Sequence, residues 1–245
     1  MSSPHLFCGG LHVDLRGDGE PLLLLHGFTG SHADWRHLFP ESPAGFRSIA
    51  PDLPGHGRSP LTAPFSFRRS AEQVAAALDE LGIERYRAIG LSGGAMSLLH
   101  LATARPESVE AMVLVSTAPY FPAQARELMA LMGPDDHDDD EWATMRKRHH
   151  LGDDQIRALW QIGHDLKDSH DDVCFTPPSL ARIRARTLVV HGDRDPLYGV
   201  EEAVEIFTAV DGCHLWVLPG GGHLPIFGDD APEFTRRALA FLDAE

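Results

Sequence analysis

The stretch Tyr86-Arg-Ala-Ile-Gly-Leu-Ser-Gly-Gly-Ala-Met96 decides how the rest of the chain is interpreted. Its first half is apolar and its second half opens a helical pattern, so it predicts a strand, a sharp turn and a helix. Gly90 and Gly94 fit such a turn because it leaves no room for side chains at the flanking positions. Ser92 would then stand at the N-terminus of the helix, where backbone N–H groups favour a developing negative charge. A tight turn with a solvated serine is the alternative interpretation.

A nucleophilic serine needs a base and an acid, and two later segments offer candidates for both. Asp193 and Asp195 follow the apolar run TLVVHG, and His223 follows the run HLWVLPG in a glycine-rich loop. These residues lie just past the predicted C-terminal ends of strands, the edge at which parallel sheets build their sites. His223 could be an ordinary loop histidine, since the chain has 15 histidines, but its place after the last strand favours a catalytic base. Both aspartates are candidates for the acid.

Short apolar runs alternate with helical stretches along most of the chain. The runs that predict strands are residues 22–27, 46–52, 86–92, 111–117, 186–193 and 214–220. Several are apolar throughout, which is typical of parallel strands that are covered on both faces. The stretches that predict helices are residues 70–83, 94–107 and 231–245. This alternation predicts an α/β fold with a doubly wound, mostly parallel sheet.

Two segments depart from the alternation. Residues 11–25 contain the turn Gly17-Asp18-Gly19, which predicts a β-hairpin that leads into the first long strand. Residues 119–180 hold only helix-like pieces, which indicates a helical cap inserted between two strands of the sheet. We therefore expect an α/β core over residues 1–118 and 181–245, with a cap over residues 119–180.

Four blocks of sequence resemble the α/β-hydrolase-fold family of serine hydrolases, and they occur in the family's order. The blocks are LLLLHGFTGSHADW, APDLPGHGRS, GLSGGAM, and the pair HGDRDP and GGGHLP. The resemblance covers nearly all of the chain outside the cap, and it implies Ser92 as the nucleophile, Asp195 as the acid and His223 as the base. Asp195 is preferred to Asp193 because the family's acid usually ends a G-x-x-D stretch. The family variant with its acid one strand earlier is excluded, because residues 116–118 carry no carboxylate.

The same resemblance implies an oxyanion hole formed by two backbone N–H groups, those of Phe28 and Gly93. His26 is expected to support this loop through a hydrogen bond, and Asp52 or Arg58 to brace the neighbouring turns. The apolar residues of the cap could line a substrate pocket or form a small core of the cap itself. They are Met129, Met132, Trp142, Leu159 and Trp160.

Composition excludes several other functions. The chain has 245 residues and a formal net charge of −15, so it lacks the basic surface that nucleic acids and acidic membranes require. Its start resembles no signal peptide, and no apolar run approaches the roughly 18 residues of a membrane span. The three cysteines are far apart and predict no disulfide framework. A cytoplasmic location is therefore the expectation.

A metal site is not expected either. The acidic run at residues 135–141 lacks the ligand spacing and central glycine of a calcium loop, and like-charge runs are usually solvated. The histidines of the cap show no zinc motif, so they are expected on the surface. They are His149, His150, His164 and His170. We expect no metal and no cofactor.

The leading hypothesis is therefore a cofactor-independent serine hydrolase that cleaves a small carboxylic ester or a lactone through an acyl-enzyme. One alternative is a carbon–carbon bond hydrolase, or a perhydrolase, of the same fold. Another is a non-catalytic ligand-binding or signalling protein that keeps the pocket. The expected partner is a small-molecule substrate. Residues 119–180 contain 13 Asp and Glu but only 6 Lys and Arg, so the cap should disfavour polyanionic substrates.

Overall fold

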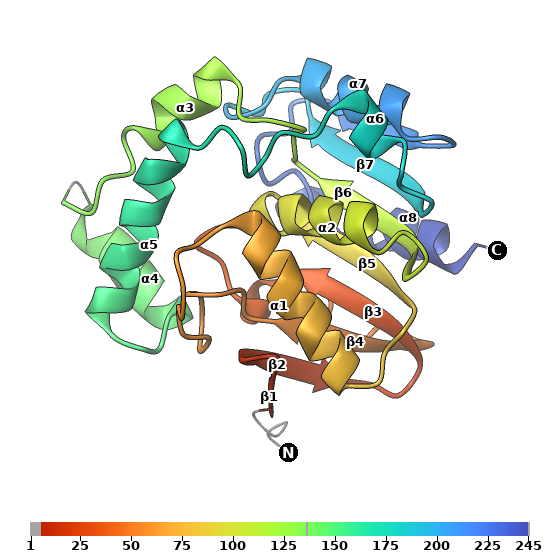
Figure 1. Cartoon of the computed structure of the whole chain (residues 1–245), viewed down its shortest axis with the longest axis horizontal. Helices are drawn as coiled ribbons and strands as arrows, with labels where there is room; N and C mark the ends of the chain where they lie inside the picture. The colour runs from red at the N-terminus through yellow and green to blue at the C-terminus, as the bar shows by residue number, and fades with distance from the viewer. Residues whose placement is uncertain (1–5, 136, 245) are drawn as a thin grey trace.

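The computed structural model describes residues 6–135 and 137–244, and a single sheet of eight strands organises it (Figure 1). In chain order the strands are β1 (Leu6–Cys8), β2 (Leu11–Arg16), β3 (Glu20–Leu25), β4 (Phe46–Pro51), β5 (Tyr86–Leu91), β6 (Val109–Val115), β7 (Arg186–Gly192) and β8 (His214–Leu218). Their order across the sheet is β1-β2-β4-β3-β5-β6-β7-β8. The strands from β4 to β8 pair in parallel, whereas β1–β2 and β2–β4 are antiparallel. The predicted α/β fold with a mostly parallel sheet is confirmed.

Helices cover both faces of the sheet, as Figure 1 shows. One face carries α1 (Phe67–Glu80), α2 (Gly93–Ala104) and α7 (Val200–Ala209), and the other carries α8 (Ala231–Asp243) and the 3-10 helix η1 (His32–His37). Successive leucines of β3 alternate between the two cores, because side chains of a strand point to opposite faces. The sequence analysis did not single out α7 or β1.

The hairpin predicted for residues 11–25 is wrong. β2 and β3 are joined by the Gly17-Asp18-Gly19 turn, but β4 lies between them and pairs with both. The run of leucines in β3 is fully buried and has parallel partners on both sides, β4 and β5. β2 instead pairs with β1, across Gly9 and Gly10, which both have positive φ.

Residues 119–180 lie between β6 and β7 in the chain. They form α3 (Ala123–Met129), α4 (Asp139–Arg148), α5 (Asp153–Asp165), the 3-10 helix η2 (Leu166–Asp168) and α6 (Pro177–Leu180). In Figure 1 the helices α3, α4 and α5 stand beside the sheet rather than on one of its faces. None of the described residues of this segment joins the sheet, and their one bridge pairs Tyr120 with Cys174. Among residues 6–135 and 137–244, none of the helices has the length and apolar character of a membrane span.

Candidate active site

Ser92 occupies the turn between β5 and α2, as the sequence predicts. Its backbone has φ 50° and ψ −115°, an unfavourable conformation for a residue with a side chain. The Ser92 amide donates to the carbonyl of Val115 at 2.8 Å, which ties the turn to β6. A Cβ atom on Gly94 would lie 2.2 Å from the carbonyl oxygen of Leu25, and one on Gly90 would lie 2.7 Å from the Cα of Ala95. The two glycines therefore let α2 pack directly against the strands.

His223 and Asp195 meet Ser92 in one hydrogen-bonded line. His223 comes from the loop after β8, and its Nε2 lies 2.8 Å from the Ser92 Oγ. The His223 Nδ1 lies 2.8 Å from Oδ2 of Asp195, which follows β7. Because an ionised carboxylate only accepts hydrogen bonds, Nδ1 carries the proton and Nε2 accepts from the serine hydroxyl. The structure thus brings together the three residues that the sequence analysis predicted as nucleophile, acid and base.

The surroundings of Asp195 favour its ionised form. Its Oδ1 accepts hydrogen bonds from the backbone amides of Leu197 at 2.8 Å and Tyr198 at 3.3 Å. Burial raises the pKa of the Asp195 carboxyl, but the hydrogen bond from His223 and those from the two amides outweigh it and hold the pKa below its ordinary value. The carboxylate therefore keeps the His223 imidazole in the tautomer whose Nε2 accepts the hydrogen bond from Ser92.

Asp193 has a different contact. Its Oδ1 accepts a hydrogen bond from the backbone amide of Gly220 at 2.6 Å. This bond links the loop after β7 to the loop that carries His223. Of the two aspartates, only Asp195 has a hydrogen bond to the imidazole among the described residues.

The backbone amides of Phe28 and Gly93 lie beside each other next to Ser92. A Cβ atom on Gly93 would lie 3.2 Å from the Phe28 nitrogen, and one on Gly27 would lie 3.7 Å from the Ser92 Cβ. Neither amide donates a hydrogen bond to another atom of the described chain. Two unused N–H donors beside a serine hydroxyl are what a developing oxyanion requires.

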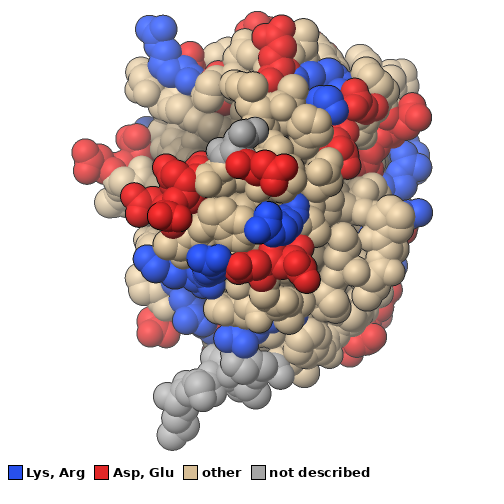
Figure 2. Space-filling view, turned by 90° about the vertical axis from the view of Figure 1, so that its left-hand side faces the viewer, with Lys and Arg blue, Asp and Glu red and all other residues tan. Residues whose placement is uncertain are grey.

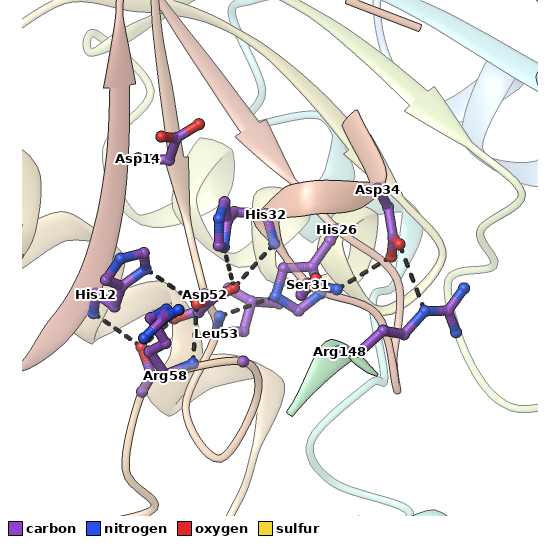
Figure 3. Close-up of polar contacts among 12 residues, drawn as sticks. His12, Asp14, His26, Ser31, His32, Asp34, Asp52, Leu53, Arg58 and Arg148 are labelled. Atoms are coloured by element: carbon purple, nitrogen blue, oxygen red, sulfur yellow. Dashed lines mark hydrogen bonds and ion pairs between the residues drawn. The ribbon is translucent and has the colours of Figure 1, made fainter. Parts of the chain in front are cut away.

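His26 holds the loop that carries Phe28 through two hydrogen bonds. The His26 Nδ1 lies 2.8 Å from the Gly27 carbonyl oxygen, and its Nε2 accepts from the Leu53 amide at 2.9 Å. Figure 3 shows the contact between His26 and Leu53. Burial lowers the pKa of His26, which keeps the ring neutral and able to accept. The supporting role expected for His26 is therefore present as two hydrogen bonds.

Asp52 braces the neighbouring loops (Figure 3). Its carboxylate accepts hydrogen bonds from the backbone amides of His32 and Arg58, each at 2.9 Å. The Nδ1 atoms of His32 and His12 lie 2.8 and 3.0 Å from its two oxygens. Burial raises the pKa of Asp52, but these histidine contacts hold it far below its ordinary value. Among the described residues, His12, His32 and Asp52 form the one group whose ligand atoms, within 4.8 Å of one another, could hold a metal ion.

A cavity of about 730 Å³ opens next to Ser92 and His223. Residues 119–180 and the rest of the chain both contribute side chains to its lining. Most of these side chains are apolar, such as Phe28, Phe67, Phe121, Met129, Met132 and Leu166. Asp34 and Arg148 line the same cavity, and the Arg148 Nε lies 3.5 Å from the Asp34 Oδ1. This ion pair links η1 to α4. Met129 and Met132, which the sequence placed either at a substrate pocket or in a core of residues 119–180, line the cavity. Trp142, Leu159 and Trp160 pack in a small core with Met145 and Ile156, and Phe28 packs against this core.

Two features of residues 119–180, the acidic run and the histidines, have outcomes to report. Asp138 starts α4, because its carboxylate accepts from the amides of Asp140 and Glu141; Asp136 of the same run lies outside the described residues. The surface position expected for His149 is wrong, because it is only 2% exposed. Both of its ring nitrogens have backbone partners on distant loops. No local pattern signals such contacts, so the sequence analysis missed this residue.

Residues 22–238 match the alpha/beta hydrolase family. The chain belongs to that family. The putative carbamate hydrolase RutD of Pseudomonas savastanoi pv. phaseolicola (strain 1448A / Race 6) is 30% identical over 96% of this chain and 98% of its own length. The 2-hydroxy-6-oxo-6-phenylhexa-2,4-dienoate hydrolase of Comamonas testosteroni is 25% identical over 95% of this chain and 91% of its own.

The fold is shared with solved structures of this family. The 2-hydroxy-6-oxo-6-phenylhexa-2,4-dienoate hydrolase from Rhodococcus sp. strain RHA1 superposes with a TM-score of 0.79, at 22% identity, over 97% of both chains. The family and its members named here support hydrolase activity and a small-molecule substrate for this alpha/beta hydrolase.

Proposed function

We propose that this alpha/beta hydrolase is a serine hydrolase that cleaves a small, uncharged carboxylic ester or lactone through an acyl-enzyme. The observation that carries the proposal is the hydrogen-bonded line from Asp195 through His223 to the hydroxyl of Ser92. In this line each residue has the partner that its role requires: a nucleophile, a base and an acid that orients the base.

The first half of the reaction forms the acyl-enzyme. The Ser92 oxygen attacks the substrate carbonyl carbon while its proton moves to Nε2 of His223. The carbonyl electron pair moves onto oxygen, and the amides of Phe28 and Gly93 donate to the resulting oxyanion. When the tetrahedral intermediate collapses, the bond to the alcohol oxygen breaks and that oxygen takes the proton from His223.

The second half releases the acid. His223 removes a proton from a water molecule, whose oxygen attacks the carbonyl carbon of the acyl-enzyme. The same two amides hold the second oxyanion. As it collapses, the Ser92 oxygen leaves the carbonyl carbon and recovers a proton from His223. Asp195 remains ionised throughout and stabilises the imidazolium that forms in each half.

The proposed function gives residues 119–180 the role of a cap over a core of residues 1–118 and 181–245. Met129 and Met132 come from this segment, and they share the cavity with Ser92 and His223. The apolar walls favour an uncharged acyl group, because burying an unpaired charge there would be costly.

A second candidate is hydrolysis of a carbon–carbon bond in a vinylogous diketone. It is favoured by the similarity to the Comamonas testosteroni hydrolase along nearly the whole chain. The RutD relative adds carbamates to the carbonyl substrates worth testing. A panel of p-nitrophenyl esters, lactones, carbamates and dienoic diketones would rank these substrates by kcat/KM, and a clear preference for the diketones would replace the ester proposal.

The nucleophile can be tested directly. A fluorophosphonate probe should label the wild-type protein at Ser92, and Ser92→Ala should abolish both labelling and ester hydrolysis while the circular dichroism spectrum is unchanged. Asp195→Asn should reduce kcat by about 10⁴-fold, as in other triads, whereas Asp193→Asn keeps the triad and serves as the matched control. Wild-type-like turnover by Ser92→Ala would overturn the proposal, and a failure of the wild type to label would favour a non-catalytic ligand-binding protein.

A further inference from the structure

We propose that His149, from residues 119–180, is a positioning residue that holds the turn of residues 27–30 in the shape required for the oxyanion hole. The inference rests on the proposed function, and it adds a residue to which no catalytic role was expected. It means that the segment proposed as a cap would complete the oxyanion hole as well as cover the cavity.

The peptide unit between Gly27 and Phe28 is fixed at its oxygen. The Gly27 carbonyl accepts from the Gly30 amide at 2.9 Å and from Nδ1 of His26 at 2.8 Å. Because a trans peptide is planar, the N–H of Phe28 points in the opposite direction to that carbonyl. Holding the Gly27 oxygen therefore aims the Phe28 amide. The bond from Gly30 exists only while the turn between these residues stays closed.

Thr29 is the unfavourable residue of this turn. It has φ 62°, in the left-handed region that glycine adopts freely and β-branched residues avoid. Its amide donates to Nε2 of His56 at 3.2 Å, and its carbonyl accepts from Nε2 of His149 at 3.1 Å. Two histidines from different parts of the chain thus hold both polar groups of one strained residue. No other described side chain of residues 119–180 has a hydrogen bond to the turn.

The ring of His149 is fixed in the tautomer that this contact needs. Its Nδ1 accepts from the Gly57 amide at 2.9 Å, so the proton sits on Nε2, which donates to the Thr29 carbonyl. The side chain is buried next to His56, with 5.9 Å between ring centroids. Burial lowers the pKa of His149 to about 4, which keeps the ring neutral. The donor to Thr29 and the acceptor for Gly57 are therefore both present at neutral pH.

Two substitutions separate the two contacts of His149. His149→Asn places an oxygen near the position of Nδ1, so it can accept from Gly57 but does not reach Thr29. His149→Gln places an N–H donor near the position of Nε2, so it can still donate to the Thr29 carbonyl. The exposed neighbour His150, substituted in the same two ways, is the matched control.

We expect His149→Asn to lower kcat by about 10- to 100-fold with little change in KM. The reason is that a misplaced Phe28 amide stabilises the oxyanion less well. His149→Gln should stay within about threefold of the wild type, and both His150 variants should be unaffected. The affinity for a trifluoromethyl ketone, which forms a tetrahedral adduct with the serine, should fall in His149→Asn by the same factor as kcat.

A rescue experiment distinguishes positioning from general destabilisation. Glycine adopts positive φ without strain, so Thr29→Gly no longer needs His149 to hold the turn. The double variant Thr29→Gly/His149→Asn should therefore recover most of the kcat that His149→Asn loses. Because recovery is measured between variants at a temperature below both melting points, a loss of stability in His149→Asn does not obscure it.

Each result has a defined meaning. Equal losses for Asn and Gln, an unchanged kcat in His149→Asn, or no recovery in the double variant would overturn the positioning role of His149. Turnover that does not depend on Ser92 would overturn the proposed function instead, and the fluorophosphonate label reports on that separately.

Discussion

Backbone strain in this hydrolase is concentrated at the ends of three strands. Among the described residues, only Thr29, Ser92 and Ser116 have positive φ without being glycine, at 62°, 50° and 50°. They follow β3, β5 and β6. Conformations of this kind cost on the order of 1–3 kcal/mol each and persist where surrounding contacts hold them. The amides of Ser92 and Ser116 donate to the next strand in the sheet, at 2.8 and 3.0 Å.

Which site residues could be predicted depends on how local their signals are. Ser92 lies between glycines that the turn requires, and His223 follows a strand in a glycine-rich loop, so both were predicted from a few neighbouring residues. Asp195 was separable from Asp193 only through the family resemblance. His149 contacts Thr29 across 120 residues, and its own neighbours give no sign of burial. Contacts at that separation depend on how the elements pack.

Buried neutral histidines should make the protein less stable in acid. Burial lowers the pKa of His149 to about 4, and it also lowers those of His26 and His56. Below about pH 6.5 the unfolded chain takes up protons at these histidines while the folded protein does not. For His149 the stability contribution is therefore complete above pH 6.5 and is lost as the pH falls towards 4, by up to about 1.4 kcal/mol per pH unit. His26 and His56 change the stability in the same direction.

Urea unfolding at a series of pH values tests this expectation. The free energy of unfolding of His149→Gln should depend less steeply on pH between 6.5 and 4, by about one proton. His170→Gln, at an exposed histidine of the same segment, should keep the wild-type slope. An unchanged slope in His149→Gln would contradict the pKa shift assigned to this residue.

The spacing and length of the apolar runs predicted the long strands of the sheet, but they did not predict which strands lie next to one another. Short apolar runs, several of them apolar throughout, identified the six parallel strands. The Gly17-Asp18-Gly19 turn gave a local hairpin signal, yet β4 lies between the strands it joins. Insertion of β4 gives the buried leucines of β3 a parallel partner on each side. Sequence-local turn chemistry does not contain that information.

The packing of α2 against β3 should tolerate no side chain at Gly94. A Cβ atom there would lie 2.2 and 2.5 Å from the carbonyl oxygens of Leu25 and His26. Gly94→Ala should therefore lower the free energy of unfolding by about 3 kcal/mol, because the helix must move away from the strand. Gly222→Ala is the control, since a Cβ atom at Gly222 has no neighbour within 4 Å. Equal urea midpoints for the two variants would contradict this account.

For the whole molecule, the net charge of −15 acts at a distance. Figure 2 looks onto the side that carries α3, α4 and α5, and it shows acidic clusters there with basic groups between them. The mixture moderates the field, but acidic residues outnumber basic ones in residues 119–180 by 13 to 6. Anionic substrates should therefore approach more slowly than neutral ones.

Salt should reveal this repulsion. Raising the ionic strength from 0.01 to 0.15 M shortens the Debye length from about 30 to about 8 Å. We expect kcat/KM to rise for an ester with a carboxylate tail and to stay constant for its neutral counterpart of the same acyl group. A parallel response of the two esters would mean that salt acts on the enzyme rather than on the approach of the substrate.

The separation of 131 positions between Ser92 and His223 has a consequence for the chain as it is made. A ribosome adding about 5–20 residues per second needs about 7–26 s to travel from Ser92 to His223. During that time the serine has no imidazole partner, and for most of it β8, which precedes the histidine in the chain, has not yet been synthesised. A nascent chain that ends before His223 lacks this hydrogen-bonded line, so we expect the proposed hydrolase activity to arise only after His223 has been synthesised.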